Sequence, residues 1–112
     1  MSYKQGDIVF VPFPFSDDTG SKFRPAIVIS NNRVNNSLDI ILAQITAKPR
    51  NDEFTFRIKN EDVEIPLANP SQIRCHKITI IQQDKIKNVI SHLKLEKQKE
   101  LFKKIIEIFQ VN

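Results

Sequence analysis

The stretch at residues 6–30, GDIVFVPFPFSDDTGSKFRPAIVIS, decides the fold because it contains two apolar runs separated by a polar loop. The runs, IVFV and AIVI, are rich in β-branched and aromatic side chains, which favour strands. The intervening SDDTGSK is typical of a loop, since its glycine permits unusual backbone angles. The stretch therefore predicts one strand at 7–12, which ends or kinks near Pro12, and a second strand at 24–30.

The second strand is apolar on both faces in its middle. Ala26 and Val28 share one face, and Ile27 and Ile29 share the other. We therefore expect this strand to be central in the sheet and buried. Arg24 lies where this strand begins, and its planar guanidinium is suited to binding phosphate or carboxylate. An arginine in this place is also a common surface residue.

Four more strands and one helix follow from the hydrophobic pattern. The strands are expected at residues 38–46, 54–58, 72–81 and 88–92, and the helix at residues 95–110. In the helix, apolar residues recur at helical spacing, and lysines and glutamates fill much of the other face. The alternation of the strand at 72–81 breaks after Lys77, which predicts a bulge or a strand end there.

These elements together predict a mainly β fold with one C-terminal α-helix. We expect a small antiparallel barrel or a strongly bent sheet, with the helix packed on its side. The 112 residues suffice for a single domain over residues 1–112. The composition, 40% hydrophobic and 27% charged, is typical of a globular protein.

The charge balance and the single cysteine narrow the function classes. The net charge of +4 suits a polyanionic partner such as nucleic acid, although many basic proteins bind none. Cys75 has no second cysteine with which to form an internal disulfide, which fits a reducing compartment. The N-terminal MSYKQGD is not an apolar leader, and no apolar run is long enough to span a membrane. We therefore expect a cytoplasmic protein.

Several kinds of catalytic site do not fit the sequence. Cys75, His76 and His92 are too few and too poorly spaced for a tetrahedral zinc site. Cys75 has no base on its own strand face, so a buried, inert thiol is the better interpretation. The chain has two glycines and no glycine-rich phosphate loop, and its acidic residues form no pair suited to two metal ions. We expect no cofactor.

A set of residues that needs no metal remains at the polar ends of the predicted strands: Arg24, Thr46, Arg74 and His76. Thr46 shares with Gln44 the polar tip of an otherwise apolar strand face, which is either the edge of a site or a strand emerging into solvent. Arginine stabilises the extra charge of a pentavalent phosphorane, and histidine exchanges protons near neutral pH. If the substrate is RNA, its own 2′-hydroxyl is the nucleophile, so this set suits metal-free phosphodiester cleavage.

Three blocks of sequence, residues 6–30, ILAQITAKP and NPSQIRCHKI, make the chain resemble the MazF/PemK family of toxins from bacterial type II toxin–antitoxin pairs. The similarity extends over nearly the whole chain, and the first block, with its PFPF and RPA, is the most specific. The resemblance implies a small SH3-like antiparallel barrel with a C-terminal helix (CcdB/MazF/Kid-like), usually as a homodimer. It also implies metal-free, ribosome-independent cleavage of single-stranded RNA by attack of the 2′-hydroxyl.

The resemblance also assigns roles to individual residues. Arg24 in the RPA motif and Thr46 in the ITA motif match the family's catalytic arginine and threonine. Ser71, Gln72 and Arg74 fall in the block that helps to line the family's substrate groove, and Lys22 and Gln44 are further residues that we expect to bind RNA. Relatives usually carry an acid where this chain has His76, the third catalytic candidate. A histidine there can transfer a proton, can indicate that this branch uses a different base, or can be structural.

The leading hypothesis is therefore an endoribonuclease toxin (an mRNA interferase) that has single-stranded RNA as its substrate and an acidic antitoxin as its partner. The antitoxin would lie across the basic clefts of a dimer, fold on binding and compete with RNA. Two alternatives share the fold: a non-catalytic CcdB-like toxin that binds DNA gyrase, and an SH3-like module that binds without catalysis. The pairing of Arg24 with Thr46 favours the nuclease.

Overall fold

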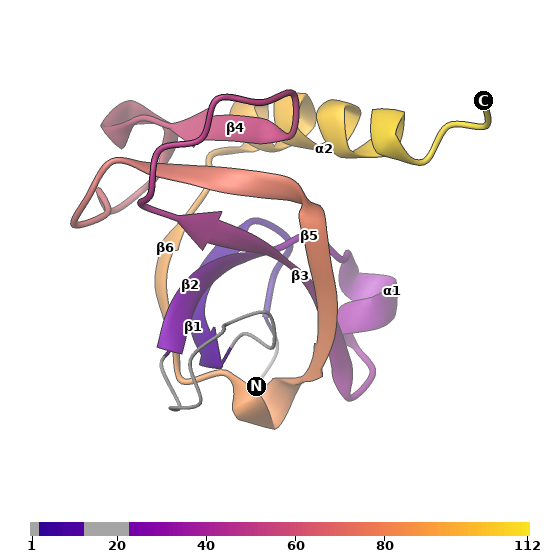
Figure 1. The fold of residues 1–112 in the computed structure, drawn as a ribbon. Helices are drawn as coiled ribbons and strands as arrows, with labels where there is room; N and C mark the ends of the chain where they lie inside the picture. The colour runs from indigo at the N-terminus through magenta and orange to yellow at the C-terminus, as the bar shows by residue number, and fades with distance from the viewer. Residues whose placement is uncertain (1–2, 13–22) are drawn as a thin grey trace.

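The computed structural model describes residues 3–12 and 23–112, in which six antiparallel strands form one curled sheet (Figure 1). The strands are β1 (Asp7–Pro12), β2 (Phe23–Val28), β3 (Asp39–Thr46), β4 (Thr55–Ile58), β5 (Ser71–Gln82) and β6 (Asn88–His92). The helices are α1 (Asn32–Asn35), α2 (Leu95–Ile108) and two short 3₁₀-helices, η1 (Asn60–Asp62) and η2 (Gln83–Lys85). The predicted barrel-like antiparallel fold with a C-terminal helix is confirmed.

The strand order across the sheet is β4-β5-β3-β2-β1-β6. The central position predicted for β2 is confirmed, because β2 pairs with β1 on one side and with β3 on the other. Strand β1 extends to Pro12, and the residues that would test the predicted end or kink there, together with the predicted loop at 16–22, lie outside the described residues. Residues 32–35, for which the sequence predicted no helix, form the short helix α1. Asn31 caps this helix, since its side chain accepts a hydrogen bond from the amide of Arg33.

The bulge predicted near Lys77 is present in β5 and coincides with a sharp bend of that strand (Figure 1). Ala43 of β3 pairs with Ile78, but the next residue, Gln44, pairs with Arg74. Residues 75–77 are therefore inserted between two successive pairs of the ladder. Such an insertion bends a strand, so the first part of β5 pairs with β4 as well as β3 and the rest continues along β3.

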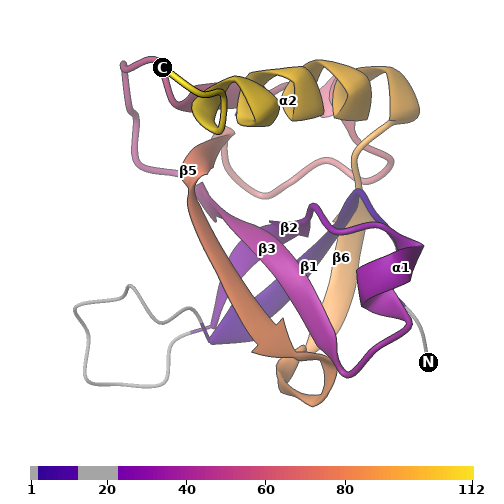
Figure 2. The ribbon, with the colours of Figure 1, turned by 90° about the vertical axis from the view of Figure 1, so that its right-hand side faces the viewer.

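The two faces of the central strands bury two apolar clusters. One cluster includes Ala26 and Val28 with other side chains of β1 and β3, and the opposite face buries Ile27 with side chains of β1, β3, β5 and α2. Burial of apolar surface on both faces explains why β2 reads as a continuous apolar run. Helix α2 lies across one end of the curled sheet (Figure 2) and inserts Leu101 and Ile105 into the second cluster.

Helix α2 is held to the start of the sheet by hydrogen bonds around Gly6. The amide of Leu93 donates to the carbonyl of Gly6 at 2.9 Å, and the buried Gln98 side chain donates from Nε2 to the carbonyl of Leu93 at 2.7 Å. No side chain caps the helix at its first turn. The buried face of α2 is narrower than its apolar pattern suggests, because Ile106 is 61% exposed and Phe109, directly after the helix, is 68% exposed.

None of the helices in the described part of the chain is long and apolar enough to cross a membrane.

Gly6 is a position where both the backbone and the packing require glycine. Its φ of +96° is rarely adopted by other residues, and an added Cβ would overlap the Gln98 amide. We expect Gly6→Ala to lower the free energy of unfolding by about 1–3 kcal/mol, measured by urea denaturation. In a Gln98→Ala background the same change should cost less, because the overlap is gone and only the backbone strain remains. A Gly6→Ala protein as stable as the parent would contradict this account.

Candidate functional site

A cavity of about 280 Å³ opens where β2 begins and β3 ends, and both Arg24 and Thr46 line it. The register explains why they meet. Val28 pairs with Leu42 and Ala26 pairs with Gln44, so the same antiparallel register, continued by two residues, places Arg24 opposite Thr46. A larger hollow of about 630 Å³ lies beside α1, but none of the described site candidates lines it.

The guanidinium of Arg24 is partly buried beside this cavity. Its Nε is buried and has no hydrogen-bond partner among the described residues. Buried donors are normally paired, so an unpaired donor on an arginine at a cavity calls for an explanation. The rest of this side chain is only partly buried, and a guanidinium lining a cavity suits an anionic ligand.

The hydroxyl of Thr46 lies at the C-terminal end of β3. Its Oγ1 accepts a hydrogen bond from the amide of Lys48 at 3.1 Å, which fixes the turn that follows the strand. The hydroxyl hydrogen is not used in this bond, so Thr46 can donate to a ligand in the cavity.

The rest of the cavity is formed mainly by apolar side chains. The lining residues besides Arg24, Thr46 and Ser71 are Phe10, Phe23, Pro25, Ile45, Ala47, Leu67, Ala68, Asn69 and Ile90. Ser71 is buried at the start of β5, and its hydroxyl donates to the carbonyl of Asn69 at 2.9 Å. Gln44 is half-buried in β3 and is not among the lining residues. Lys22 lies outside the described residues.

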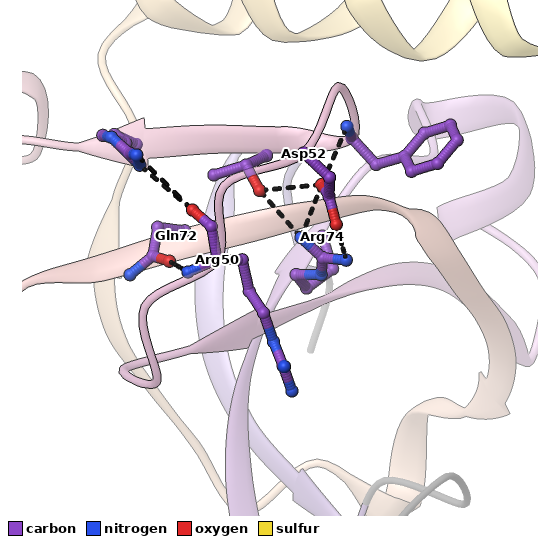
Figure 3. Close-up of polar contacts among 7 residues, drawn as sticks. Arg50, Asp52, Gln72 and Arg74 are labelled. Atoms are coloured by element: carbon purple, nitrogen blue, oxygen red, sulfur yellow. Dashed lines mark hydrogen bonds and ion pairs between the residues drawn. The ribbon is translucent and has the colours of Figure 1, made fainter.

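Arg74 does not line the cavity but forms a bidentate ion pair with Asp52 (Figure 3). Nη1 donates to one carboxylate oxygen at 3.0 Å and Nη2 to the other at 2.8 Å, while Nη1 also donates to Thr55 Oγ1 at 2.7 Å. The hydrogen bonds from Arg74 hold the pKa of the Asp52 carboxyl well below its usual range. Arg74 is 6% exposed, so this pair neutralises a buried cation.

Gln72, two residues before Arg74 in β5, also contacts the segment between β3 and β4. It is buried, and its Oε1 accepts a hydrogen bond from the amide of Arg50 at 2.9 Å (Figure 3). Gln72 pairs through its backbone with Thr46. The segment that follows Thr46 is thus hydrogen-bonded to Gln72, the residue that pairs with Thr46 in the sheet.

His76 lies in the bulge of β5, outside the cavity lining. Its ring stacks on Phe54, with centroids 4.3 Å apart and planes 27° from parallel. Partial burial, and then the positive charge of Arg74, lower the pKa of His76 below its ordinary value. The neutral imidazole therefore predominates at neutral pH.

The structure divides the predicted site residues into two groups. Arg24, Thr46 and Ser71 share the cavity, whereas Gln72, Arg74 and His76 contact the segment between β3 and β4. Sequence reasoning assigned no role to Asp52, Phe54 or Arg50 in that segment. One signal was available for Asp52, because an arginine in a strand that packs against a sheet needs a counter-charge nearby.

Two features bear on other chemistries. The Cys75 thiol is fully buried, and burial raises its pKa to about 11, so little thiolate forms at neutral pH. Within residues 3–12 and 23–112, no group of three or more His, Cys, Asp or Glu side chains is placed to hold a metal ion.

Three comparisons with known proteins extend these observations. Comparison with curated protein sequences gives no significant match. Solved structures match closely in fold. A mycobacterial endoribonuclease in complex with its cognate antitoxin has a TM-score of 0.80 at 14% identity, covering 99% of this chain and 98% of that one.

Two further structures show the same fold. The Mycobacterium tuberculosis toxin MazF-mt6 has a TM-score of 0.74 at 18% identity, covering 95% of this chain and 98% of that one. A MazE–MazF crystal structure from Deinococcus radiodurans has a TM-score of 0.78 at 13% identity and covers 100% of both chains.

Comparison with models of protein families matches nearly the whole chain and not only the residues of the candidate site. The model of the PemK-like, MazF-like toxins of type II toxin–antitoxin systems matches residues 4–109, which include every strand and helix described above. The resemblance seen in the RPA and ITA motifs is therefore confirmed, and the chain belongs to the family of PemK-like, MazF-like toxins of type II toxin–antitoxin systems.

Proposed function

We propose that this chain is an endoribonuclease toxin that cleaves single-stranded RNA without a metal ion and without the ribosome. The observation that carries the proposal is the convergence of Arg24 and Thr46, from neighbouring strands, on one cavity. Family membership supports the toxin role. Two proteins of similar fold are themselves described as endoribonucleases, which supports the activity.

In the proposed reaction, the 2′-hydroxyl oxygen of one nucleotide attacks the adjacent phosphorus and gives up its proton to a base, either a side chain or solvent water. The bond from phosphorus to the 5′-oxygen of the next nucleotide breaks, and that oxygen takes a proton from an acid, again a side chain or water. The products are a 2′,3′-cyclic phosphate and a 5′-hydroxyl. Because the substrate supplies its own nucleophile, no metal ion is needed to generate one.

The cavity supplies the groups that such a reaction needs. The guanidinium of Arg24 stabilises the negative charge that develops on the phosphorane oxygens. The hydroxyl of Thr46 donates a hydrogen bond to the same phosphate, which fixes its orientation. The apolar wall, which includes Phe10 and Leu67, offers a surface against which an unstacked base can pack.

The proposed partners follow from the net charge of the chain and from the proteins of similar fold. The net charge of +4 favours a polyanionic substrate and an acidic antitoxin segment that competes with it. Similar folds have been solved with a cognate antitoxin and as MazE–MazF, which supports an antitoxin for this chain. A homodimer would bring two basic cavities together, and the cytoplasm would provide the RNA.

The metal-free mechanism is tested by RNA cleavage in EDTA. We expect the purified protein to cleave a long single-stranded RNA equally well with and without the chelator, leaving 2′,3′-cyclic phosphate or 3′-phosphate ends and 5′-hydroxyl ends. Mass spectrometry of the fragments identifies these ends. Loss of cleavage in EDTA with recovery on adding Mg²⁺ would refute the metal-free step. A folded protein that leaves RNA intact but inhibits DNA gyrase would instead support the non-catalytic alternative.

The sequence made His76 a candidate for proton transfer, but this residue lies outside the cavity lining, so the role is tested by the pH dependence of the cleavage rate. The pKa of His76 is lowered, so a base at this position loses its proton below the ordinary pKa of about 6.5. The rate should therefore rise with pH through that lower value and then level off, and His76→Ala should remove this acidic limb. A folded His76→Ala protein with an unchanged profile and a near-normal kcat would rule out the role.

A further inference from the structure

The segment between β3 and β4, residues 47–54, is tied to the sheet at several points, and we call it the 47–54 loop. At its start, Thr46 Oγ1 accepts from the amide of Lys48. In its middle, Gln72 Oε1 accepts from the amide of Arg50 at 2.9 Å, and the guanidinium of Arg57 reaches the Arg50 carbonyl at 3.4 and 3.5 Å. These contacts fix the backbone on both sides of Arg50.

The end of the 47–54 loop is held by the strongest of these contacts. The Asp52 carboxylate accepts hydrogen bonds from both terminal nitrogens, Nη1 and Nη2, of Arg74. Asp52 Oδ1 also accepts from the Thr55 hydroxyl and from the amide of Phe54, each at 3.0 Å. A bidentate arginine–carboxylate pair is directional as well as strong. The loop is therefore positioned by β5, through Gln72 and Arg74.

The residues that hold the loop have few exposed polar groups left with which to bind a ligand. Both terminal nitrogens of Arg74 are occupied, its side chain is 7% exposed, and the side-chain oxygen of the buried Gln72 is taken by Arg50. The loop itself presents two exposed cations, Lys48 and Arg50. Arg50 uses only its backbone in the contacts above, and its side chain points away from Gln72 and Asp52 (Figure 3).

Arg50 is close enough to the cavity to contact the same nucleic acid. Ala47 lines the cavity, and Arg50 follows it by three residues, so their Cα atoms are at most about 11 Å apart. A strand whose phosphate lies between Arg24 and Thr46 would pass this loop on leaving the cavity at that side. An exposed guanidinium on a backbone that is held in place suits a neighbouring phosphate.

We propose that Arg50 binds a phosphate of the RNA next to the one in the cavity, and that Asp52, Arg74 and Gln72 are positioning residues that hold Arg50 in place. The inference rests on the proposed RNA-cleaving function and refines it. Arg74, which the family resemblance places among the RNA-binding residues, then acts on RNA through the 47–54 loop and not by direct contact.

The contact is tested by binding of a fluorescein-labelled, 2′-O-methyl RNA 12-mer of mixed sequence, which has phosphates but no 2′-hydroxyl nucleophile. Fluorescence anisotropy at several salt concentrations gives the slope of log K against log salt. Arg50→Ala should reduce the magnitude of this slope by about 0.7, the value for one phosphate contact on a single strand. Arg50→Lys should restore most of it, because lysine keeps the charge.

Arg33→Ala is the matched control, since it removes the same charge from an exposed site on α1, at the opposite end of β2 and β3 from the cavity. It should leave the slope at the parent value. Equal slopes for Arg50→Ala and Arg33→Ala would overturn the contact. Because the probe cannot be cleaved, this result is independent of the nuclease assay: a protein that binds through Arg50 but cleaves no RNA would refute only the proposed function.

The positioning role is tested by Asp52→Asn, whose two possible effects have opposite signs. The substitution makes the net charge more positive and releases Arg74, so a direct contact between Arg74 and RNA predicts tighter binding. If the loop positions Arg50, Asp52→Asn should bind RNA more weakly than the parent. Adding Arg50→Ala to Asp52→Asn should then reduce the affinity little further. Tighter binding, or a full additional loss in the double variant, would overturn the role. If Asp52→Asn does not fold, Gln72→Ala, which removes the acceptor for the Arg50 amide, should give the same weaker binding and coupling.

Discussion

The bulge in β5 is the constraint on which the rest of this structure depends. Residues 75–77 are inserted between the pairs Ala43–Ile78 and Gln44–Arg74, and the strand bends there. The bend lets one strand pair with β3 along its length while its first part also carries β4. Without it the sheet would be flatter.

The bend also determines where the functional groups lie. On the N-terminal side of the bulge, β5 contributes Ser71 to the cavity and Gln72 and Arg74 to the 47–54 loop. The β2–β3 register independently brings Arg24 to Thr46. The site is thus assembled from strand ends, which the sheet holds rigidly, and from one loop that β5 fixes in place. In such an arrangement, strand residues set the geometry of charged groups that they do not themselves expose.

The sequence was sufficient to predict most of the fold, and it singled out the two residues that meet at the candidate site. Alternation and apolar runs located the strands, and the phase change after Lys77 located the bulge. The RPA and ITA motifs pointed to Arg24 and Thr46. These residues meet because the hydrophobic pattern of β2 and β3 determines how the two strands are aligned. The short helix α1 was missed because its asparagines are as typical of turns as of helix caps.

The contacts of Arg74 could not be predicted in the same way. They depend on how the 47–54 loop folds back, and its sequence, rich in charged and turn residues, is compatible with many conformations. The sequence therefore identified Arg74 as important but not its partner, Asp52. For the same reason it did not distinguish an arginine that contacts the ligand from one that positions another residue.

The central claim is that the cavity lined by Arg24 and Thr46 is where RNA is cleaved. It is tested most directly by the single-turnover cleavage rate of Arg24→Ala, measured beside its thermal unfolding and beside Arg33→Ala. The account predicts a parent-like unfolding transition and a rate lower by about 10²–10³, because one preorganised charge donor is lost. Arg33→Ala should cleave at the parent rate. A folded Arg24→Ala protein that cleaves as fast as Arg33→Ala would contradict the account.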